Sequence, residues 1–293
     1  MVPRRVRLGP AMNVLSLQSH VAYGHVGNAA AVFALQRIGV EVWPVHTVQL
    51  SNHTGYATAR GQIFDAGHVR GVVQGLEERG ALGRCNGVLS GYVGSAEVGS
   101  AILDAVTAAK HANPKARYCC DPVIGDVAQG VFVKPEVARF MRERAVPAAD
   151  IVTPNHFELD HLTSQRTTRV AAALRAVDEL RACGPRTVLV TSLVTEETPA
   201  DAIDMVVCDD AGRHRLRVPK LPVTAHGAGD LIAALFLAHV LRTASAAEAL
   251  SQAASAVHGV LARTAAAKSG EMLLVEAQDE LVRPSRMFRP EPI

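Results

Sequence analysis

Two glycines and an acidic residue precede an apolar segment in the last third of the chain. The sequence reads His226-Gly227-Ala228-Gly229-Asp230, followed by LIAALFLAHVL. Glycines let backbone N–H groups point toward one centre, and a helix N-terminus adds about half a positive charge there. We therefore expect an anion hole at Gly227, Ala228 and Gly229, beside which Asp230 could take a proton from an attacking hydroxyl group. A glycine turn with Asp230 as a favourable helix charge explains the same residues equally well.

A second carboxylate, Asp121, ends the apolar run YCC and is followed by Pro122. A carboxylate at the tip of a buried strand is costly unless something pairs with it, and Mg²⁺ on a nucleotide phosphate would do so. An aspartate before proline also often opens a turn. We favour the metal-binding interpretation.

The segment 153–158 (TPNHFE) follows another predicted strand. Asn155 with Glu158 three residues later is the capping-box pattern, which stabilises a helix by roughly 1 kcal/mol without any ligand. Spacing alone does not separate this from a ligand-binding role. The hydroxyl groups of Thr191 and Ser192, after the strand TVLV, could likewise cap the chain or meet a phosphate.

Two loops rich in hydrogen-bonding groups leave the first two predicted strands. They are 19–28 (SHVAYGHVGN) and 51–56 (SNHTGY). Together they could surround a polar heteroaromatic ring. Each histidine alone is more often a solvated loop residue than a ligand, so the twelve histidines do not indicate a metal cluster.

Short apolar strands alternate with alanine-rich helices from Asn13 almost to Pro219. The predicted strands are 13–18, 40–50, 86–90, 116–120, 150–153, 187–191, 203–208 and 213–218. The predicted helices are 27–38, 69–81, 95–111, 135–144, 156–162 and 168–182, with two more near 230–242 and 246–267. This alternation predicts an α/β fold with a mainly parallel sheet covered on both faces. The pair 203–208 and 213–218 predicts an antiparallel hairpin.

The polar residues singled out above nearly all follow a predicted strand. Ligands of open parallel sheets bind beyond the carboxyl ends of the strands. We therefore expect one edge of the sheet to collect the chemistry.

The composition indicates a globular protein with a small-molecule partner. Of 293 residues, 48% are hydrophobic and 20% charged, which excludes a disordered chain. A net charge of +2 gives no electrostatic footprint for nucleic acid or a membrane surface. Five cysteines without a C-x-x-C pair predict free thiols in a cytoplasmic protein. Residues 1–11 are expected to be an unstructured leader, and 12–293 a single domain.

Six motifs together resemble the pyridoxal kinases of the ribokinase-like superfamily. They are LSLQSHVAYGHVGN at the first strand, VQLSNHTGY at the second, LSGYVGS at 89–95, CDPVIGD at 120–126, TPNHFE at 153–158 and HGAGD at 226–230. The resemblance runs from Asn13 to about Phe288. It implies a three-layer ribokinase-like fold, with a central mostly parallel sheet between helices, commonly as a homodimer. It also implies ATP-dependent phosphorylation of the 5′-hydroxymethyl group of pyridoxal, pyridoxine or pyridoxamine.

The resemblance further implies a role for each matching residue. Asp230 matches the catalytic base, and Gly227, Ala228 and Gly229 match the anion hole. The residues that match the surroundings of the pyridine ring are Ser19, Val26, His53, Thr54, Gly55, Tyr92 and Asp230. Those that match the ATP side are Asp121, Thr153, Glu158, Thr191, Ser192, Val218, Pro219, Lys220 and Leu221, with Asp121 and Glu158 the expected Mg²⁺ ligands. A potassium-type ion near the anion hole is usual in this family.

Two departures from the family pattern bear on turnover. Ala228 stands where some members carry Thr, and the loop after Asp126 (DVAQGVFV) is shorter than the extended lid of longer members. One rival interpretation is a hydroxymethylpyrimidine kinase of the same superfamily, which often has Cys where Asp230 stands. A rival from another class is a catalytically weak B6-vitamer binding protein. The short loop leaves that second rival open, Asp230 argues against both, and the SNHTGY loop also argues against the first.

Overall fold

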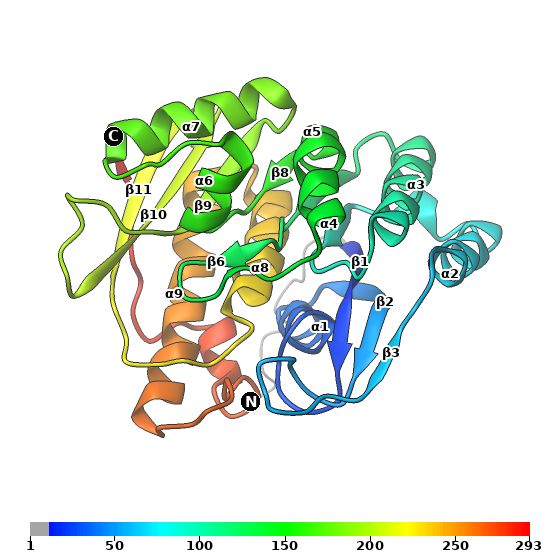
Figure 1. Cartoon of the computed structure of the whole chain (residues 1–293), viewed down its shortest axis with the longest axis horizontal. Coiled ribbons are helices and arrows are strands. Elements are labelled where there is room, and N and C mark those ends of the chain that lie inside the picture. The colour runs from blue at the N-terminus through cyan, green and yellow to red at the C-terminus, as the bar shows by residue number, and fades with distance from the viewer. Residues whose placement is uncertain (1–11) are drawn as a thin grey trace, which may run out of the picture.

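A computed structural model of the protein describes residues 12–293. The prediction of an unstructured leader at 1–11 lies outside the described residues. The described chain forms three layers, with one large sheet between two layers of helices (Figure 1).

The large sheet has ten strands: β1 (Asn13–Val21), β2 (Glu41–Leu50), β3 (Gly61–Ile63), β4 (Gly87–Ser90), β5 (Arg117–Cys120), β8 (Ile151–Val152), β9 (Thr187–Leu193), β10 (Ala202–Asp209), β11 (Gly212–Pro219) and β12 (Glu291–Pro292). Their order across the sheet is β12-β11-β10-β9-β8-β5-β4-β1-β2-β3. The six strands from β9 to β2 run parallel, and β3, β10, β11 and β12 join antiparallel. This confirms the predicted mainly parallel sheet and the hairpin of β10 and β11. A separate hairpin is formed by β6 (Gly125–Asp126) and β7 (Gly130–Val131).

The helices are α1 (Asn28–Arg37), α2 (Ala66–Glu78), α3 (Ala96–Ala112), α4 (Pro135–Phe140), α5 (Val146–Ala148), α6 (His156–Thr163), α7 (Val170–Cys183), α8 (Ala228–Thr243) and α9 (Ala246–Ala266). The predicted helix 135–144 is α4 continued by a π-helical turn, Met141–Ala145. The very short strands β3, β6, β7 and β12 have no predicted counterpart, because two or three residues are too few to show an alternating pattern.

Alternation along the strands divides the core between the two faces of the sheet. Leu15 and Leu17 of β1 belong to the core cluster that includes residues of α2 to α7, whereas Val14 belongs to the cluster that includes residues of α1, α8 and α9. Side chains of a strand point alternately to opposite faces, so both faces of the sheet are covered.

Helix α8 is the central support of the second face. Its residues from Leu231 to Ala238 are all buried. A helix that is apolar on every side must lie inside the protein, and here α8 packs among α1, α9 and the sheet. The N-terminus of this buried helix carries the glycine-rich motif to the edge where the parallel strands end.

The five cysteines are free thiols, four of them buried. Among the helices of residues 12–293, none is long and apolar enough to cross a membrane.

Candidate functional site

The N-terminus of α8 is left open by its cap residue. Gly227 precedes the helix with φ 93°, a left-handed conformation that favours glycine, and it offers no side-chain cap. The first intrahelical bond runs from the Leu231 N–H to the Gly227 carbonyl at 2.9 Å. The N–H groups of Ala228, Gly229 and Asp230 therefore precede the helical hydrogen-bond ladder, as an anion hole requires. By contrast, Ser95 caps α3 through its side chain.

The carboxylate of Asp230 lies at this helix end against the loop between β1 and α1. Desolvation raises its pKa to about 6, and hydrogen bonds from the backbone N–H of Gly27 and from its own N–H oppose that rise. A carboxyl group with this pKa is mostly ionised at neutral pH and can accept a proton. The geometry thus allows the general-base role, while the position in the first turn also satisfies the helix-charge interpretation.

Asp121 follows β5 directly and is 6% exposed. Its Oδ1 accepts a hydrogen bond from the Thr153 hydroxyl at 3.2 Å. A Cβ built on Gly229 would lie 4.0 Å from Asp121 Oδ2, so this carboxylate stands beside the anion hole. Burial raises the pKa of Asp121 well above its usual range, and the carboxylates of Glu158 and Asp230 raise it further.

Asp121, directly after β5, therefore lies close enough to two other acids, Glu158 of α6 and Asp230 of α8, to be affected by their charge. Between residues 12 and 293, neither an arginine nor a lysine forms an ion pair with Asp121, Glu158 or Asp230. Buried like charges without a counterion are unfavourable, so this donor set suits a bound cation. No set of three or more metal-ligating side chains is preformed in the described part of the chain.

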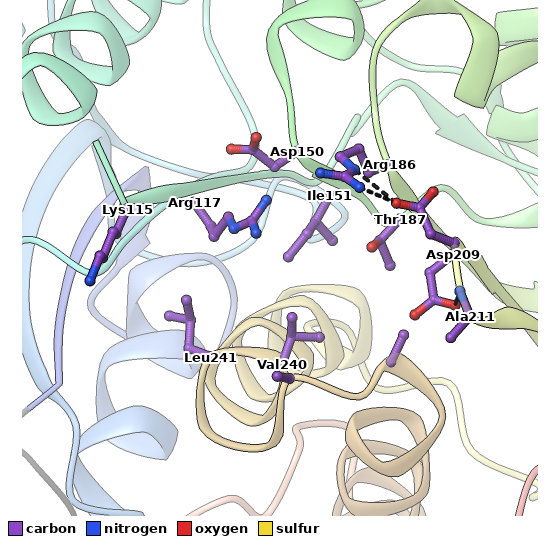
Figure 2. A pocket seen from close by; sticks show the side chains of 13 residues that line it. Lys115, Arg117, Asp150, Ile151, Arg186, Thr187, Asp209, Ala211, Val240 and Leu241 are labelled. Atoms are coloured by element: carbon purple, nitrogen blue, oxygen red, sulfur yellow. Dashed lines mark hydrogen bonds and ion pairs between the residues drawn. The ribbon is translucent and has the colours of Figure 1, made fainter. Parts of the chain in front are cut away.

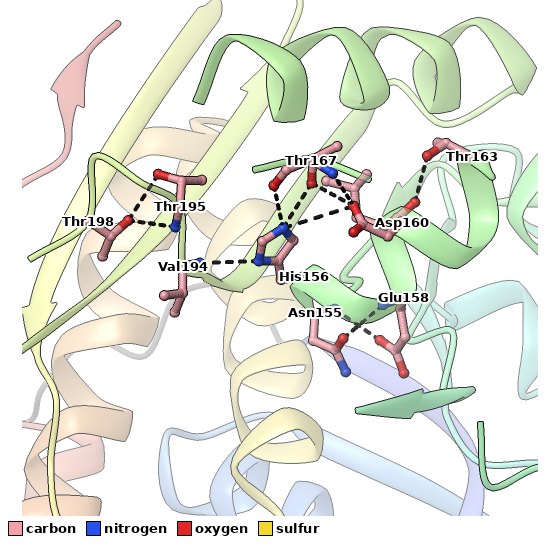
Figure 3. Close-up of polar contacts among 10 residues, drawn as sticks. Asn155, His156, Glu158, Asp160, Thr163, Thr167, Val194, Thr195 and Thr198 are labelled. Carbon is pink, nitrogen blue, oxygen red and sulfur yellow. Dashed lines mark hydrogen bonds and ion pairs between the residues drawn. The ribbon is translucent and has the colours of Figure 1, made fainter. Parts of the chain in front are cut away.

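Glu158 completes a capping box, which is one of the two interpretations that the sequence left open. The Asn155 side chain accepts from the Glu158 N–H, and Glu158 Oε2 accepts from the Asn155 N–H, both at 2.9 Å (Figure 3). Glu158 Oε1 accepts from the Ile124 N–H at 2.9 Å, which holds the loop after Asp121. Burial raises the pKa of Glu158 to about 7, and these backbone donors oppose that rise.

His156, which follows Asn155 in the motif TPNHFE, has a structural role. Its Nε2 lies 2.8 Å from the Thr167 carbonyl oxygen, and its Nδ1 accepts from the Val194 N–H at 3.3 Å (Figure 3). The ring therefore joins α6 to the end of β9 and to the loop after α6. This fixes the helix that presents Glu158.

A cavity of about 400 Å³ lies between α8, α9 and the strands β9 to β11. Its walls include six residues that the resemblance places on the ATP side, namely Thr191, Ser192, Val218, Pro219, Lys220 and Leu221. Two anion-hole residues, Ala228 and Gly229, line the same cavity. The structure thus places these six residues together beside the open end of α8, whereas Asp121, Thr153 and Glu158, also predicted on the ATP side, do not line this cavity.

The predicted vitamer loops meet the anion hole from the other side. A Cβ on Gly227 would lie 1.8 Å from the His25 carbonyl oxygen, so the β1–α1 loop packs directly on this glycine. Gly27 has φ 55°, and a Cβ there would lie 2.7 Å from Ser19 Oγ. The imidazole ring of His53, in the loop after β2, stacks on that of His226, just before α8, with centroids 3.9 Å apart.

Three further predicted vitamer residues differ in their surroundings. Val26 is buried, Thr54 is exposed, and Tyr92 is half-buried against the core. The Tyr92 carbonyl accepts from the Thr47 hydroxyl at 3.0 Å. These residues occupy the expected edge of the sheet, and none is joined to another by a hydrogen bond recorded within residues 12–293.

Asn28 and Tyr56 make polar contacts near this edge that were not predicted from the sequence. Buried Asn28 accepts from the Ser16 hydroxyl at 2.7 Å and lies 3.0 Å from His46 Nδ1. The Tyr56 hydroxyl donates to Glu271, which raises the pKa of Tyr56 to about 12. No sequence pattern in these loops predicts the contacts of Asn28. Tyr56 and Glu271 are 215 residues apart, so no local pattern can link them.

A second cavity, of about 420 Å³, lies at the opposite edge of the sheet, where β5, β8 and β9 begin (Figure 2). Its acidic residues already have partners: Lys110 pairs with Asp150, Arg181 and Arg186 pair with Asp210, and Asp209 accepts from the Ala211 and Gly212 N–H groups. None of the predicted site residues lines it. The chemistry-bearing residues therefore collect at the other edge, as the sequence predicts.

Comparisons with known proteins show which family the chain resembles in sequence and fold. A family model described as "Phosphomethylpyrimidine kinase" matches residues 83–274. Pyridoxal kinase PdxY of Granulibacter bethesdensis is 53% identical over 281 residues, covering 94% of this chain and 98% of the relative. Pyridoxal kinase PdxY of Rubrobacter xylanophilus is 50% identical over 281 residues, covering 96% and 97%. The solved structure of pyridoxal kinase from Leishmania donovani, in complex with ADP and pyridoxamine, matches with a TM-score of 0.89 at 29% identity, covering 96% of this chain and 99% of that one.

Proposed function

Because the chain belongs to the pyridoxal kinase family, we propose that it performs the family's reaction at the site built around the N-terminus of α8. The enzyme transfers the terminal phosphoryl group of ATP to the 5′-hydroxymethyl group of pyridoxal, pyridoxine or pyridoxamine. The products are ADP and the vitamer 5′-phosphate.

The position of Asp230 is the observation that carries this mechanism. It stands between the wall of the nucleotide cavity, formed by Ala228 and Gly229, and the β1–α1 loop, whose Gly27 N–H hydrogen-bonds its carboxylate. Asp230 takes the proton of the 5′-hydroxyl group as its oxygen attacks the terminal phosphorus of ATP. The N–H groups that open α8 stabilise the negative charge of the transferring group.

The two substrates approach Asp230 from opposite sides. The adenine and ribose of ATP occupy the cavity beside Val218 to Leu221, with Thr191 and Ser192 near the phosphates. The pyridine ring lies among Ser19, Val26, His53, Thr54, Gly55 and Tyr92. This division follows from the separate positions of the cavity and the two loops.

The carboxylate of Asp121 fits a divalent cation. It is buried, faces two other acids and accepts only the Thr153 hydroxyl among the side chains of residues 12–293. We assign Mg²⁺ to Asp121. Glu158 would be a second contact, through the carboxylate lone pairs that do not accept from backbone N–H groups. Bound there, Mg²⁺ would neutralise phosphate charge. A potassium-type ion near the anion hole is part of the same proposal, and rates in potassium and sodium salts test it.

The proposal extends to the molecule as a whole: residues 12–293 act as one kinase domain, in a cytoplasmic homodimer.

The loop after Asp126 forms the short hairpin of β6 and β7, closed by hydrogen bonds from the Ala128 and Gln129 N–H groups to the Asp126 carboxylate. Such a lid is small, so we expect water to be excluded mainly by the vitamer loops.

The deciding experiment is a coupled assay of ADP release. Pyridoxal, pyridoxamine and pyridoxine are each offered with ATP and Mg²⁺, and hydroxymethylpyrimidine is offered in parallel. A pyridoxal kinase turns over at least one B6 vitamer in preference to the pyrimidine. Preference for the pyrimidine supports the rival kinase, and vitamer binding by calorimetry without ADP release supports a binding protein.

A further inference from the structure

The stacked rings of His53 and His226 join two parts of the site. Their centroids are 3.9 Å apart and their planes are inclined by 23°. His53 belongs to the loop after β2, and His226 is the first residue of the glycine-rich motif. The stack is therefore a direct contact between the loop that holds the pyridine ring and the loop that forms the anion hole. His53 matches a pyridine-ring residue of the family, whereas no role was expected for His226.

Gly55 packs against the edges of both rings. Its N–H donates to His53 Nδ1 at 3.0 Å, so this nitrogen is an acceptor and a neutral His53 carries its proton on Nε2. A Cβ on Gly55 would lie 2.9 Å from His53 Nδ1 and 3.3 Å from His226 Nε2. A larger residue here would push the rings, so the absence of a side chain at Gly55 is part of the stack.

The other vitamer loop reaches the anion hole by different contacts. The β1–α1 loop packs its His25 carbonyl on Gly227 and gives the Gly27 N–H to Asp230. The loop after β2 contacts the glycine-rich motif through the stack of His53 on His226. Moving His226 would therefore shift His53 relative to Asp230, while leaving the contacts at Gly227 and Gly27 in place.

We propose that His226 is a positioning residue for the vitamer: by stacking on His53 it places the pyridine-binding loop relative to Asp230. The inference deepens the proposed function and rests on it, because it takes His53 as a contact of the pyridine ring. His226 is not among the residues that line the nucleotide cavity. Its influence should therefore appear in vitamer binding and not in ATP binding.

The test compares His226→Ala, His226→Phe, His53→Ala and the double variant His53→Ala/His226→Ala. His111→Ala, at an exposed position near the end of α3, is the matched control. We expect His226→Ala to raise the KM for pyridoxal by roughly threefold to tenfold, the worth of one aromatic pair. The KM for ATP and the melting temperature should stay at the values of the control. His226→Phe should recover most of the loss, because a flat ring remains to stack.

The double variant separates positioning through His53 from an independent contact. If His226 acts through His53, the double variant has the same KM for pyridoxal as His53→Ala alone. Multiplied effects, equal losses for ATP and pyridoxal, or a lowered melting temperature with no rescue by phenylalanine would overturn the inference. If the wild type releases no ADP with any vitamer, the proposed function fails instead. Calorimetric binding of pyridoxal to the same variants then still tests His226.

Discussion

The carboxylate of Glu158 accepts a hydrogen bond from the backbone N–H of Ile124 at 2.9 Å, although the two residues are 34 positions apart. Its other oxygen accepts from Asn155 N–H at the start of α6. One buried side chain therefore both caps a helix and holds the loop that leaves Asp121. This double role makes Glu158 structural, whatever it contributes to metal binding.

Replacing Glu158 separates these contributions. Glu158→Ala should lower the free energy of unfolding by about 1–3 kcal/mol, because three backbone donors lose their acceptor. Glu158→Gln keeps one acceptor oxygen and should lose less. If the residue also serves the metal, both variants need more Mg²⁺ at saturating ATP. An unchanged Mg²⁺ dependence with lower stability would leave Glu158 with the capping role alone.

Replacing Asp121, unlike replacing Glu158, should raise stability while it lowers activity. Its raised pKa means that the folded protein holds a proton that the unfolded chain releases, so the residue costs stability increasingly as the pH rises. Asp121→Asn should therefore raise the melting temperature at pH 8 without nucleotide or metal, while turnover falls. Thermal unfolding and the coupled assay check both. A variant that is less stable at pH 8 would contradict the assigned charge cluster.

The division of the site predicts selective losses at Ser19 and Thr54. Ser19 lies near the end of β1, where the sequence predicted a loop, and Thr54 lies in the loop after β2; both are absent from the walls of the nucleotide cavity. Ser19→Ala and Thr54→Ala should each weaken pyridoxal binding by about 0.5–1.5 kcal/mol, the worth of one neutral hydrogen bond. ATP binding should change little, as calorimetry can show. Equal losses for both substrates would argue against two separate sides.

The strands and helices that position the site were largely predictable because each is long enough to show its period. All eight predicted strands and the apolar α8 appear in the structure. Six of the residues expected on the ATP side, Thr191 of β9 and Val218 of β11 among them, line one cavity at one end of the sheet. Their contact with the nucleotide stays a prediction.

Contacts between distant loops could not be predicted in the same way. The partner of Tyr56 is Glu271, and the partner of His53 is His226. No local period or cap pattern links such residues, because loop conformation alone brings them together. The capping box at Asn155 was predictable from its spacing. The additional hydrogen bond from the Ile124 N–H to Glu158 was not, because it depends on tertiary packing.

His239 of α8 should make the protein sensitive to acid. Burial and Arg242 lower its pKa to about 4, against an ordinary value of 6.5. As the pH falls below 6.5, the unfolded chain takes a proton that the folded protein refuses, so stability is lost toward pH 4. Between pH 7 and pH 5, the wild type should lose about 1–2 kcal/mol more than His239→Gln, in denaturant unfolding. Equal losses would show that His239 does not contribute.

Asp230→Asn tests the central claim most directly. Asparagine keeps the size of the side chain and its place in the first turn of α8, but it cannot accept the proton of the 5′-hydroxyl group. The measurement is the turnover number at saturating ATP, Mg²⁺ and pyridoxal, with binding of both substrates followed by calorimetry. We expect turnover to fall by roughly 10²–10⁴-fold with little change in either binding constant. Near-normal turnover in a folded variant would contradict it, because Asp230 would then be a helix charge and the reaction would need another base.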